Sequence, residues 1–119
     1  MAWGSKTQIA SGVSATSTET YSSAITLNPR ELAHVQVKAD FPTSPTDHLE
    51  VSVYTTLDDS SETWDDVPIY AFQISNTSDP SVASIQLSGL YKFRLGFKAT
   101  GSTDTITVDA WVRKDGVSA

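Results

Sequence analysis

The sequence contains no cysteine, and of its 119 residues only two are histidine and one is methionine. Without cysteine the chain has no disulfide, no thiolate nucleophile and no cysteine-ligated zinc, so its fold rests on packing and hydrogen bonds. No stretch approaches the roughly 18 apolar residues that a membrane-spanning helix needs, which predicts no membrane partner. The first residues lack the apolar core of a signal peptide. We therefore expect a chain that begins at or near Met1 and is made in a cytoplasm.

Basic residues are scarce as well. Eight Lys and Arg accompany 14 Asp and Glu, which gives a net charge of −6 and a sequence pI near 4.6. A protein that follows nucleic-acid phosphates needs clustered Lys and Arg, whereas here they are scattered, so we predict no nucleic-acid partner. The helix formers Leu, Glu and Lys are sparse, while Ser and Thr supply about a quarter of the residues, a balance that favours short strands and polar loops.

The clearest pattern is the alternation of apolar and polar residues, which is typical of strands with one face on a core and the other in water. It predicts about eight strands, over residues 7–13, 24–27, 35–41, 49–57, 69–74, 82–87, 91–100 and 106–113. We expect the last two to form a hairpin across GSTD. In NPRELAHV, residues 28–35, proline and the following acid predict a tight turn or a 3₁₀ piece rather than a helix.

Strand count and spacing define the expected fold class. About eight short strands at regular intervals predict an all-β protein with a single antiparallel β-sandwich, jelly-roll-like in its connections. The polar run SATSTETYSS, residues 14–23, predicts a long loop or an extended arm. We expect residues 1–119 to form one domain, within which residues 1–20 are an extended polar arm or an edge strand.

The stretch LDDSSETWDDVP, residues 57–68, places five carboxylates around one tryptophan. It lacks the glycine and the closing glutamate of an EF-hand, which leaves open a looser calcium site built from the acids at positions 58, 59, 65 and 66. A glycosidase would need two carboxylates about 5 to 10 Å apart. A solvated loop between two strands is the interpretation that we favour.

No other constellation suggests chemistry. His34 and His48 stand alone in their segments, which favours structural roles over zinc ligation. The serine-rich stretches contain no G-x-S-x-G elbow. We predict no catalytic residue, no metal ligand and no cofactor, and a protein that is not an enzyme.

Aromatic residues and arginines on the polar faces of strands are enriched where proteins meet proteins. On the strand 91–100 and its expected neighbour, contact surface and cross-strand charge pairing are both open. A tryptophan near the chain start suggests docking, either on a neighbouring chain or on its own sandwich. The protein-interface candidates are Trp3, Trp64, Arg94, Trp111 and Arg113.

Four segments together carry a family resemblance: MAWGSKTQ, SPTDHLEVSVYTTLDDSSETWDDVPIYAFQI, YKFRLGFKATGSTDT and WVRKDG. They resemble a group of small virion proteins of tailed bacteriophages that share a Met-Ala-Trp-Gly start, an SPTDH turn, a W-D-D-x-P stretch and a GSTDT hairpin. The resemblance covers most of the chain from Ala33 onward and the first few residues. The chain departs from the pattern in the acidic loop, where DDSSET lengthens the stretch before the tryptophan.

The resemblance implies a β-sandwich capsid decoration, or cement, protein on the outer surface of the head. Its implied partner is the major capsid protein, and it implies a homo-oligomer, with a trimer favoured. It implies no catalytic residue. The expected location is the virion, after synthesis in the host cytoplasm. Two alternatives remain open: a neck or tail structural component, and a carbohydrate- or calcium-binding β-sandwich module.

Overall fold

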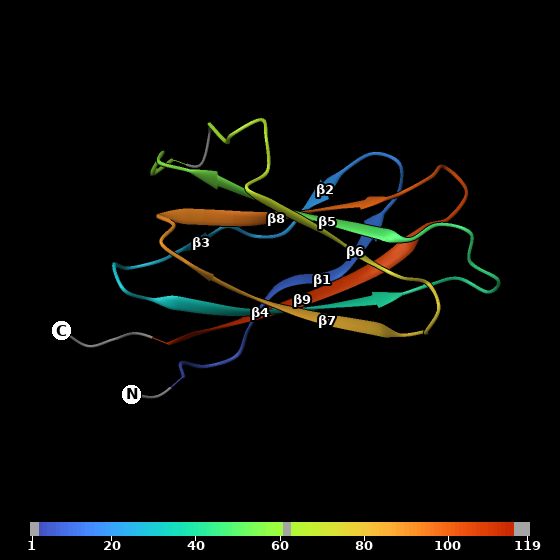
Figure 1. Cartoon of the computed structure of the whole chain (residues 1–119), viewed down its shortest axis with the longest axis horizontal. Helices are drawn as coiled ribbons and strands as arrows, with labels where there is room; N and C mark the ends of the chain where they lie inside the picture. Colours follow the sequence, from blue (N-terminus) through green and yellow to red (C-terminus); the bar gives the residue numbers. More distant parts are fainter. Residues whose placement is uncertain (1–2, 61–62, 116–119) are drawn as a thin grey trace.

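The structure, a computed structural model, describes residues 3–60 and 63–115, and these form nine strands without a helix (Figure 1). The strands are β1 (Thr7–Ala15), β2 (Thr20–Tyr21), β3 (Ile25–Thr26), β4 (Leu32–Asp40), β5 (Leu49–Thr56), β6 (Tyr70–Ile74), β7 (Ser81–Ser88), β8 (Lys92–Ala99) and β9 (Ile106–Asp115). The predicted all-β class is confirmed. Within the described ranges no helix is present that could cross a membrane. Met1, Ala2, Glu62 and Gly116, which belong to motifs used above, lie outside the described residues.

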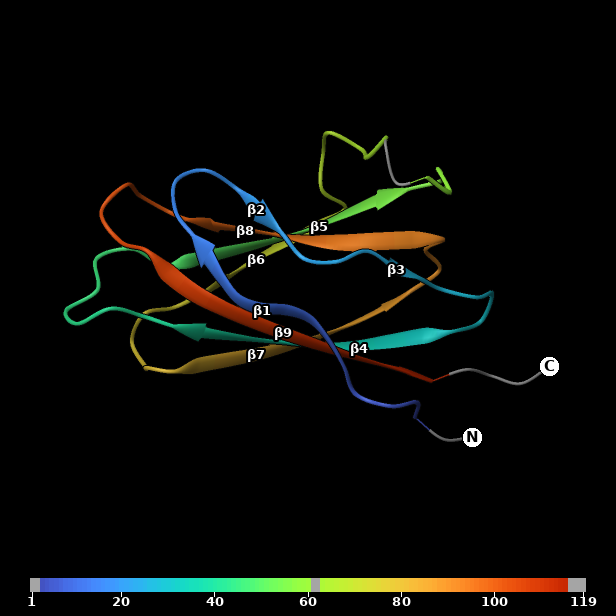
Figure 2. The same ribbon diagram turned by 180° about the vertical axis from the view of Figure 1, so that it is seen from behind.

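The strands form two antiparallel sheets that face each other, as the two sides of the molecule in Figures 1 and 2 show. One sheet has the order β1-β9-β4-β7, and the other β2-β8-β5-β6, with β3 also paired to β8. Because β2 and β3 pair with the same strand, they act as one interrupted strand. Pairing then joins β1 to β9, β2 and β3 to β8, β4 to β7, and β5 to β6. This is one long hairpin rolled up on itself, which is the jelly-roll arrangement.

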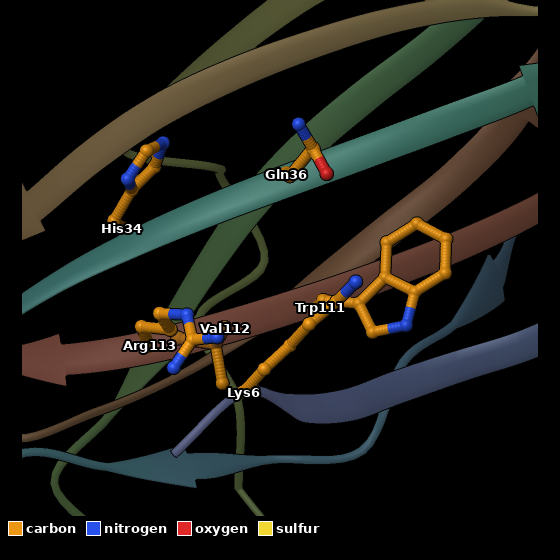
Figure 3. Close-up of a pocket in the computed structure, with 6 residues that line it drawn as sticks. All are labelled: Lys6, His34, Gln36, Trp111, Val112 and Arg113. Carbon is orange, nitrogen blue, oxygen red and sulfur yellow. The ribbon is translucent and has the colours of Figure 1, made fainter. Parts of the chain in front are cut away.

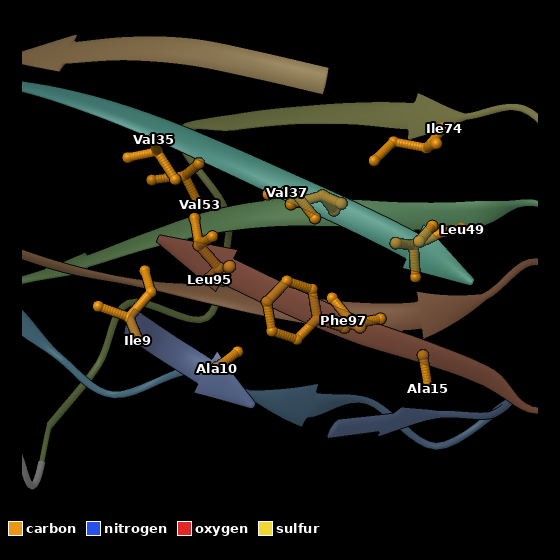
Figure 4. Packing of buried hydrophobic residues seen from close by; sticks show 14 of the residues in the cluster. Ile9, Ala10, Ala15, Val35, Val37, Leu49, Val53, Ile74, Leu95 and Phe97 are labelled. Atoms are coloured by element: carbon orange, nitrogen blue, oxygen red, sulfur yellow. The ribbon is translucent and has the colours of Figure 1, made fainter. Parts of the chain in front are cut away.

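The core lies between the sheets and follows from the alternation in the sequence. Alternate residues of the four central strands point inward, and Figure 4 shows those of β4, β5 and β8 meeting between the sheets. Those fully or almost fully buried are Ala33, Val35, Val37, Ala39, Leu49, Val51, Val53, Phe93, Leu95, Phe97, Ala99, Ile106, Val108, Ala110 and Val112. Burying a large aliphatic or aromatic side chain contributes about 1.5–3 kcal/mol, so this layer dominates the stability of the fold.

The predicted hairpin between residues 91–100 and 106–113 is wrong. Strand β8 pairs with β5, β2 and β3, whereas β9 pairs with β1 and β4, so the GSTD connection crosses from one sheet to the other. Charge pairing between the polar faces of these two strands is therefore excluded. Both strands have a row of apolar residues that face inward, but this pattern does not show which sheet each strand joins.

The turn predicted in NPRELAHV is confirmed. The N–H of Glu31 donates to the carbonyl of Asn28 at 3.0 Å, and the Glu31 carboxylate accepts the N–H of Asn28 at 2.7 Å. Arg30 has a φ of +72°, the value of the third residue of a type II turn, where glycine or asparagine is usual. The connection is a β-turn and contains no helical residue.

Candidate protein-interaction surfaces

The five interface candidates separate into two groups on opposite sides of the sandwich. Trp3, Trp111 and Arg113 lie at the outer face of the β1-β9-β4-β7 sheet. Trp64 and Arg94 lie together at the outer face of the other sheet. Trp3 and Arg113 are exposed, whereas Trp111 is half-buried. Trp64 and Arg94 are both half-buried and contact each other.

The first surface is the Trp111 face, which we define as Trp3, Lys6, His34, Gln36, Trp111 and Arg113. Strand pairing sets Gln36 opposite Trp111 and His34 opposite Arg113. The Lys6 ammonium lies over the Trp111 ring, 4.7 Å from its centroid. Figure 3 shows the side chains from three neighbouring segments around a shallow depression of about 280 Å³.

The N-terminal segment docks on the chain's own sandwich. The Trp3 ring contacts the His34 ring edge-on at a centroid distance of 6.0 Å, and the Trp3 backbone forms an isolated β-bridge with Asp115. Gly4 donates its N–H to the Lys114 carbonyl at 2.7 Å, and its carbonyl accepts Arg113 Nη1 at 2.9 Å. Of the two alternatives left open for Trp3, the structure shows the intramolecular one. Trp3 nevertheless remains 46 % exposed, so much of its ring can meet another surface.

The cations of the Trp111 face have no carboxylate partner among the described residues. The ion pairs among the described residues are Lys38–Asp40 at 3.9 Å and Lys114–Glu31 at 3.8 Å, and none of these four residues belongs to the Trp111 face. The two acids of β9 are Asp109 and Asp115, and neither forms an ion pair with Lys6 or Arg113. Asp109 accepts the N–H of Gly12 at 2.8 Å and lies 3.4 Å from the Gln8 amide nitrogen. In a chain of net charge −6, Lys6 and Arg113 thus form a cationic site that suits carboxylate or carbonyl groups.

The second surface is the Arg94 clamp, which we define as Glu19, Tyr21, Tyr54, Trp64 and Arg94. The guanidinium carbon of Arg94 lies 3.8 Å from the Tyr21 ring centroid and 4.6 Å from that of Trp64. Glu19 accepts hydrogen bonds from the hydroxyls of Tyr21 at 3.1 Å and Tyr54 at 2.9 Å. Trp64 therefore packs onto its own sandwich. The clamp holds the acidic loop and the β1–β2 connection against β8.

Burial and the nearby negative charge change the acidity of the two tyrosines. Burial and the hydrogen bond to Glu19 raise the pKa of Tyr54 from its usual 10.0 to about 12. Burial, followed by the charge of Glu19, also raises the pKa of Tyr21, and the opposing effect of Arg94 is smaller. Both groups stay protonated at neutral pH and donate to the carboxylate.

The acidic loop uses its carboxylates to hold its own backbone. Asp58 accepts the N–H and hydroxyl of Ser60 at 3.0 and 2.7 Å and the N–H of Thr63 at 3.2 Å. The hydrogen bond from the Ser60 hydroxyl is the main cause that lowers the pKa of Asp58. Asp65 accepts the Thr55 hydroxyl at 3.0 Å. Within residues 3–60 and 63–115, no group of three or more His, Asp or Glu is arranged to hold a metal ion.

Two further contacts tie the same loop to β8 and the residue before it. The Tyr91 hydroxyl donates to the Asp59 carboxylate, which raises the pKa of Tyr91. Lys92 donates to the Asp59 carbonyl at 2.8 Å. The structure thus supports the interpretation of this stretch as a connection between two strands, β5 and β6.

Sequence reasoning missed a reciprocal pair of turns at one end of the sandwich. One carboxylate oxygen of Asp47 accepts the N–H groups of Thr103 and Asp104 at 3.1 and 2.9 Å. In return, one Asp104 oxygen accepts the N–H groups of Thr46 and Asp47 at 2.6 and 2.7 Å. The signal was present, because SPTDH and GSTDT both contain Thr-Asp in a turn-rich setting. Spacing in the sequence does not show that the two turns meet.

His48 has the structural role predicted for it. Its Nδ1 accepts the N–H of Asn76 at 3.1 Å. The Asn76 amide nitrogen donates to the carbonyls of Pro45 and Asp47 at 3.3 and 3.1 Å. This arrangement joins the β6–β7 connection to the same cluster of turns.

Comparison with known proteins adds no family to these observations: no protein-family model matches the sequence, and no curated protein shows significant similarity to it.

Proposed function

We propose that this protein is a structural virion protein of a tailed bacteriophage, a capsid decoration protein that binds the major capsid protein through the Trp111 face. The observation that carries the proposal is that the exposed Trp3, Lys6 and Arg113 share one sheet face with the half-buried ring of Trp111. Exposed tryptophan and arginine at one place are typical of the residues that dominate protein–protein binding. The family resemblance in the sequence supplies the identity of the partner.

The physical setting suits docking on a repeating shell. The outer face of this sheet offers two aromatic rings and two cations without carboxylate partners among the described residues. Acidic or carbonyl groups on the partner would complete these interactions. A shell presents many identical sites, so an oligomer gains avidity from individually weak contacts. The resemblance favours a trimer for this oligomer.

The proposal is tested on expanded heads that lack this protein. We expect the purified protein to bind them, and the double variant Trp111→Ala/Arg113→Ala to bind at least about 30-fold more weakly, as for a hot spot of about 2 kcal/mol. Binding of the wild type should weaken as salt rises, because the cations are exposed. The matched control is Lys98→Ala, an exposed change on the opposite sheet.

Electron cryo-microscopy density of the phage particle shows which of the proposed locations is correct. Decorated heads with the Trp111 face toward the shell support the proposal. A subunit found at the neck or tail instead supports the alternative location. Failure of the wild type to bind heads, together with no such subunit anywhere on the particle, overturns the virion proposal.

A second candidate, a carbohydrate-binding module, rests on the same tryptophan. Trp111 lies opposite Gln36 on one side and Gln8 on the other, with Lys6 above the ring. A flat aromatic ring can stack on a sugar, and the amide oxygens beside it can accept hydrogen bonds from the sugar hydroxyls. Calorimetry with a glycan panel would detect this binding, and Trp111→Ala should abolish it. Heat released or absorbed on adding calcium would indicate a calcium site in the acidic loop as well. Asp58 and Asp65 would then have to give up their present hydrogen bonds to bind the ion.

A further inference from the structure

Strand β7 forms an unusually regular edge of the β1-β9-β4-β7 sheet. Its eight residues, Ser81–Ser88, pair with β4 in unbroken register, and within residues 3–60 and 63–115 its other side faces no strand of its sheet. The unpaired N–H and C=O groups of such an edge form a ready template for another strand. Strand β6, the edge of the second sheet, contacts this strand.

The other edges are short or irregular. Strand β1 has two register shifts, and the positive φ of Gly12, +59°, lies within the second. Strands β2 and β3 have two residues each, and β6 has five. Short strands and bulges are the usual devices that prevent edge pairing. Strand β7 contains neither a bulge nor a proline nor a charged residue.

The lack of charge extends beyond the strand. In residues 67–88 the only charged residue is Asp79, and its carboxylate accepts the Phe41 N–H at 3.0 Å. Between β6 and β7 lies an open groove of about 410 Å³ with an apolar wall of Ile69, Tyr70, Ile85, Leu87 and Leu90. Ile69 and Tyr70 are about half exposed, at 50 and 49 %. This side of the molecule therefore combines an unpaired edge with apolar surface.

We propose that β7 pairs in antiparallel fashion with β7 of a second copy of this chain, which gives a dimer with one continuous sheet across a two-fold axis. A strand that pairs with itself in this way is self-complementary, as a two-fold interface requires. The inner row of each β7, which includes Ile85 and Leu87, continues the apolar inner face of the other. The axis also brings the half-exposed Ile69 and Tyr70 of each copy toward the partner.

Charge explains why the second copy approaches at this edge. Each chain carries a net charge of −6, so two copies repel one another at most orientations. Residues 67–88 carry only the charge of Asp79, so this side adds little to that repulsion. The inference does not depend on the proposed binding to a capsid, since an isolated protein in solution would show the same pairing. It is an alternative to the trimer that the resemblance favours.

Cross-linking tests the pairing directly because the chain has no cysteine. Val82, Ser84 and Gln86 lie on the outer row of β7, so we expect a Val82→Cys, Ser84→Cys or Gln86→Cys variant to form a disulfide-linked dimer under mild oxidation. If the two-fold axis instead passes through residue 83 or 85, two different outer positions lie opposite each other. The cross-link would then form in a mixture of Val82→Cys with Ser84→Cys, or of Ser84→Cys with Gln86→Cys. The matched control is Ser14→Cys, an outer serine of the opposite edge strand β1, which should stay unlinked.

Solution mass provides the second, independent measurement. We expect a two-chain mass in sedimentation experiments, and at least a tenfold weaker dimer for Ser84→Lys, because a charge on an edge strand opposes pairing. Ser14→Lys should leave the dimer unchanged, and equal melting temperatures for the two variants at dilution would show that the monomer is intact. At a protein concentration of about 1 mM, even a dimer with a Kd of about 1 mM would be abundant. A single-chain mass at that concentration overturns the inference. So does a three-chain mass, or efficient cross-linking of Ser14→Cys alone.

Discussion

Tyr54 couples stability to pH at the scale of single residues through its hydrogen bond to Glu19. The Glu19 carboxylate accepts the hydroxyls of Tyr21 and Tyr54, and burial together with this hydrogen bond raises the pKa of Tyr54 from 10.0 to about 12. Between these values the native state holds a proton that the unfolded state has lost. The stabilising contribution is therefore complete below pH 10 and is lost as the pH rises through about 12.

Tyr54→Phe removes the titrating hydroxyl and tests this linkage. We expect a loss of about 1 kcal/mol at neutral pH, the usual contribution of one hydrogen bond. We also expect the melting temperature of the variant to fall less steeply than that of the wild type between pH 10 and 12. Tyr70→Phe, at a half-exposed ring on β6, is the control. Equal slopes for the wild type and Tyr54→Phe would contradict the assignment to this tyrosine.

Gly96 makes room for the same carboxylate. A Cβ atom at this position would lie 2.5 Å from the Glu19 Oε2 atom and 2.8 Å from the Tyr54 ring. Gly96→Ala should displace Glu19, with a loss of about 1–3 kcal/mol from overpacking, and should return the Tyr54 pKa toward its usual value. Ultraviolet titration of tyrosine ionisation measures the second effect, which a simple steric change elsewhere would not produce. Lys98→Ala on the same strand should change neither quantity.

At the scale of strands, the sequence alone predicted where strands occur better than it predicted which strands pair. Period-2 alternation located eight of the nine strands, because each has one apolar row on the core. It missed β2, a two-residue strand in a polar run. It also joined β8 to β9 in a hairpin, since alternation states which residues face inward but not which sheet receives them. Pairing between residues far apart in the chain leaves no periodic signal.

The reciprocal turns of Asp47 and Asp104 are the element most open to a direct test. Each carboxylate accepts two backbone N–H groups of the other turn. We expect Asp47→Ala and Asp104→Ala each to cost about 1–3 kcal/mol, because each leaves donors unsatisfied. The double variant should cost less than the sum, since both substitutions release the same pair of turns.

Chemical denaturation of the four species in this cycle supplies the coupling energy. Asp40→Ala is the control, because its partner Lys38 lies 3.9 Å away in an exposed ion pair that is worth about 0–1 kcal/mol. Strictly additive losses from the two turn substitutions would mean that the turns are held independently.

At the scale of the whole molecule, the rolled hairpin explains why the candidate surfaces could be named but not grouped. Trp64 sits in the β5–β6 connection, the tip of the hairpin, and folds back onto β8. Trp3 and Trp111 come from opposite ends of the chain and lie on one sheet face because the N-terminal segment runs beside β9. Residue type alone marked all three as interface candidates. Only the three-dimensional pairing separates the internal clamp from the exposed face.

A single core shared by both sheets predicts cooperative unfolding. Phe97, fully buried on β8, belongs to the same cluster as the inward residues of β4 and β9. Removing its ring by Phe97→Ala should cost about 3–5 kcal/mol, a large part of the 5–15 kcal/mol typical of a domain. Because the cavity weakens both layers at once, the two sheets should lose their structure together.

Tryptophan fluorescence can follow each sheet separately. A Trp3→Phe/Trp111→Phe variant leaves Trp64 to report on the β2-β8-β5-β6 sheet, and a Trp3→Phe/Trp64→Phe variant leaves Trp111 to report on the other. In each variant we expect the fluorescence transition to coincide with the loss of strand signal in circular dichroism, with and without Phe97→Ala. A Trp111 transition that precedes the loss of strand signal would show that the β1-β9-β4-β7 sheet opens alone. In that case the exposed Trp111 face would belong to a layer that can separate from the core, rather than to a rigid docking surface.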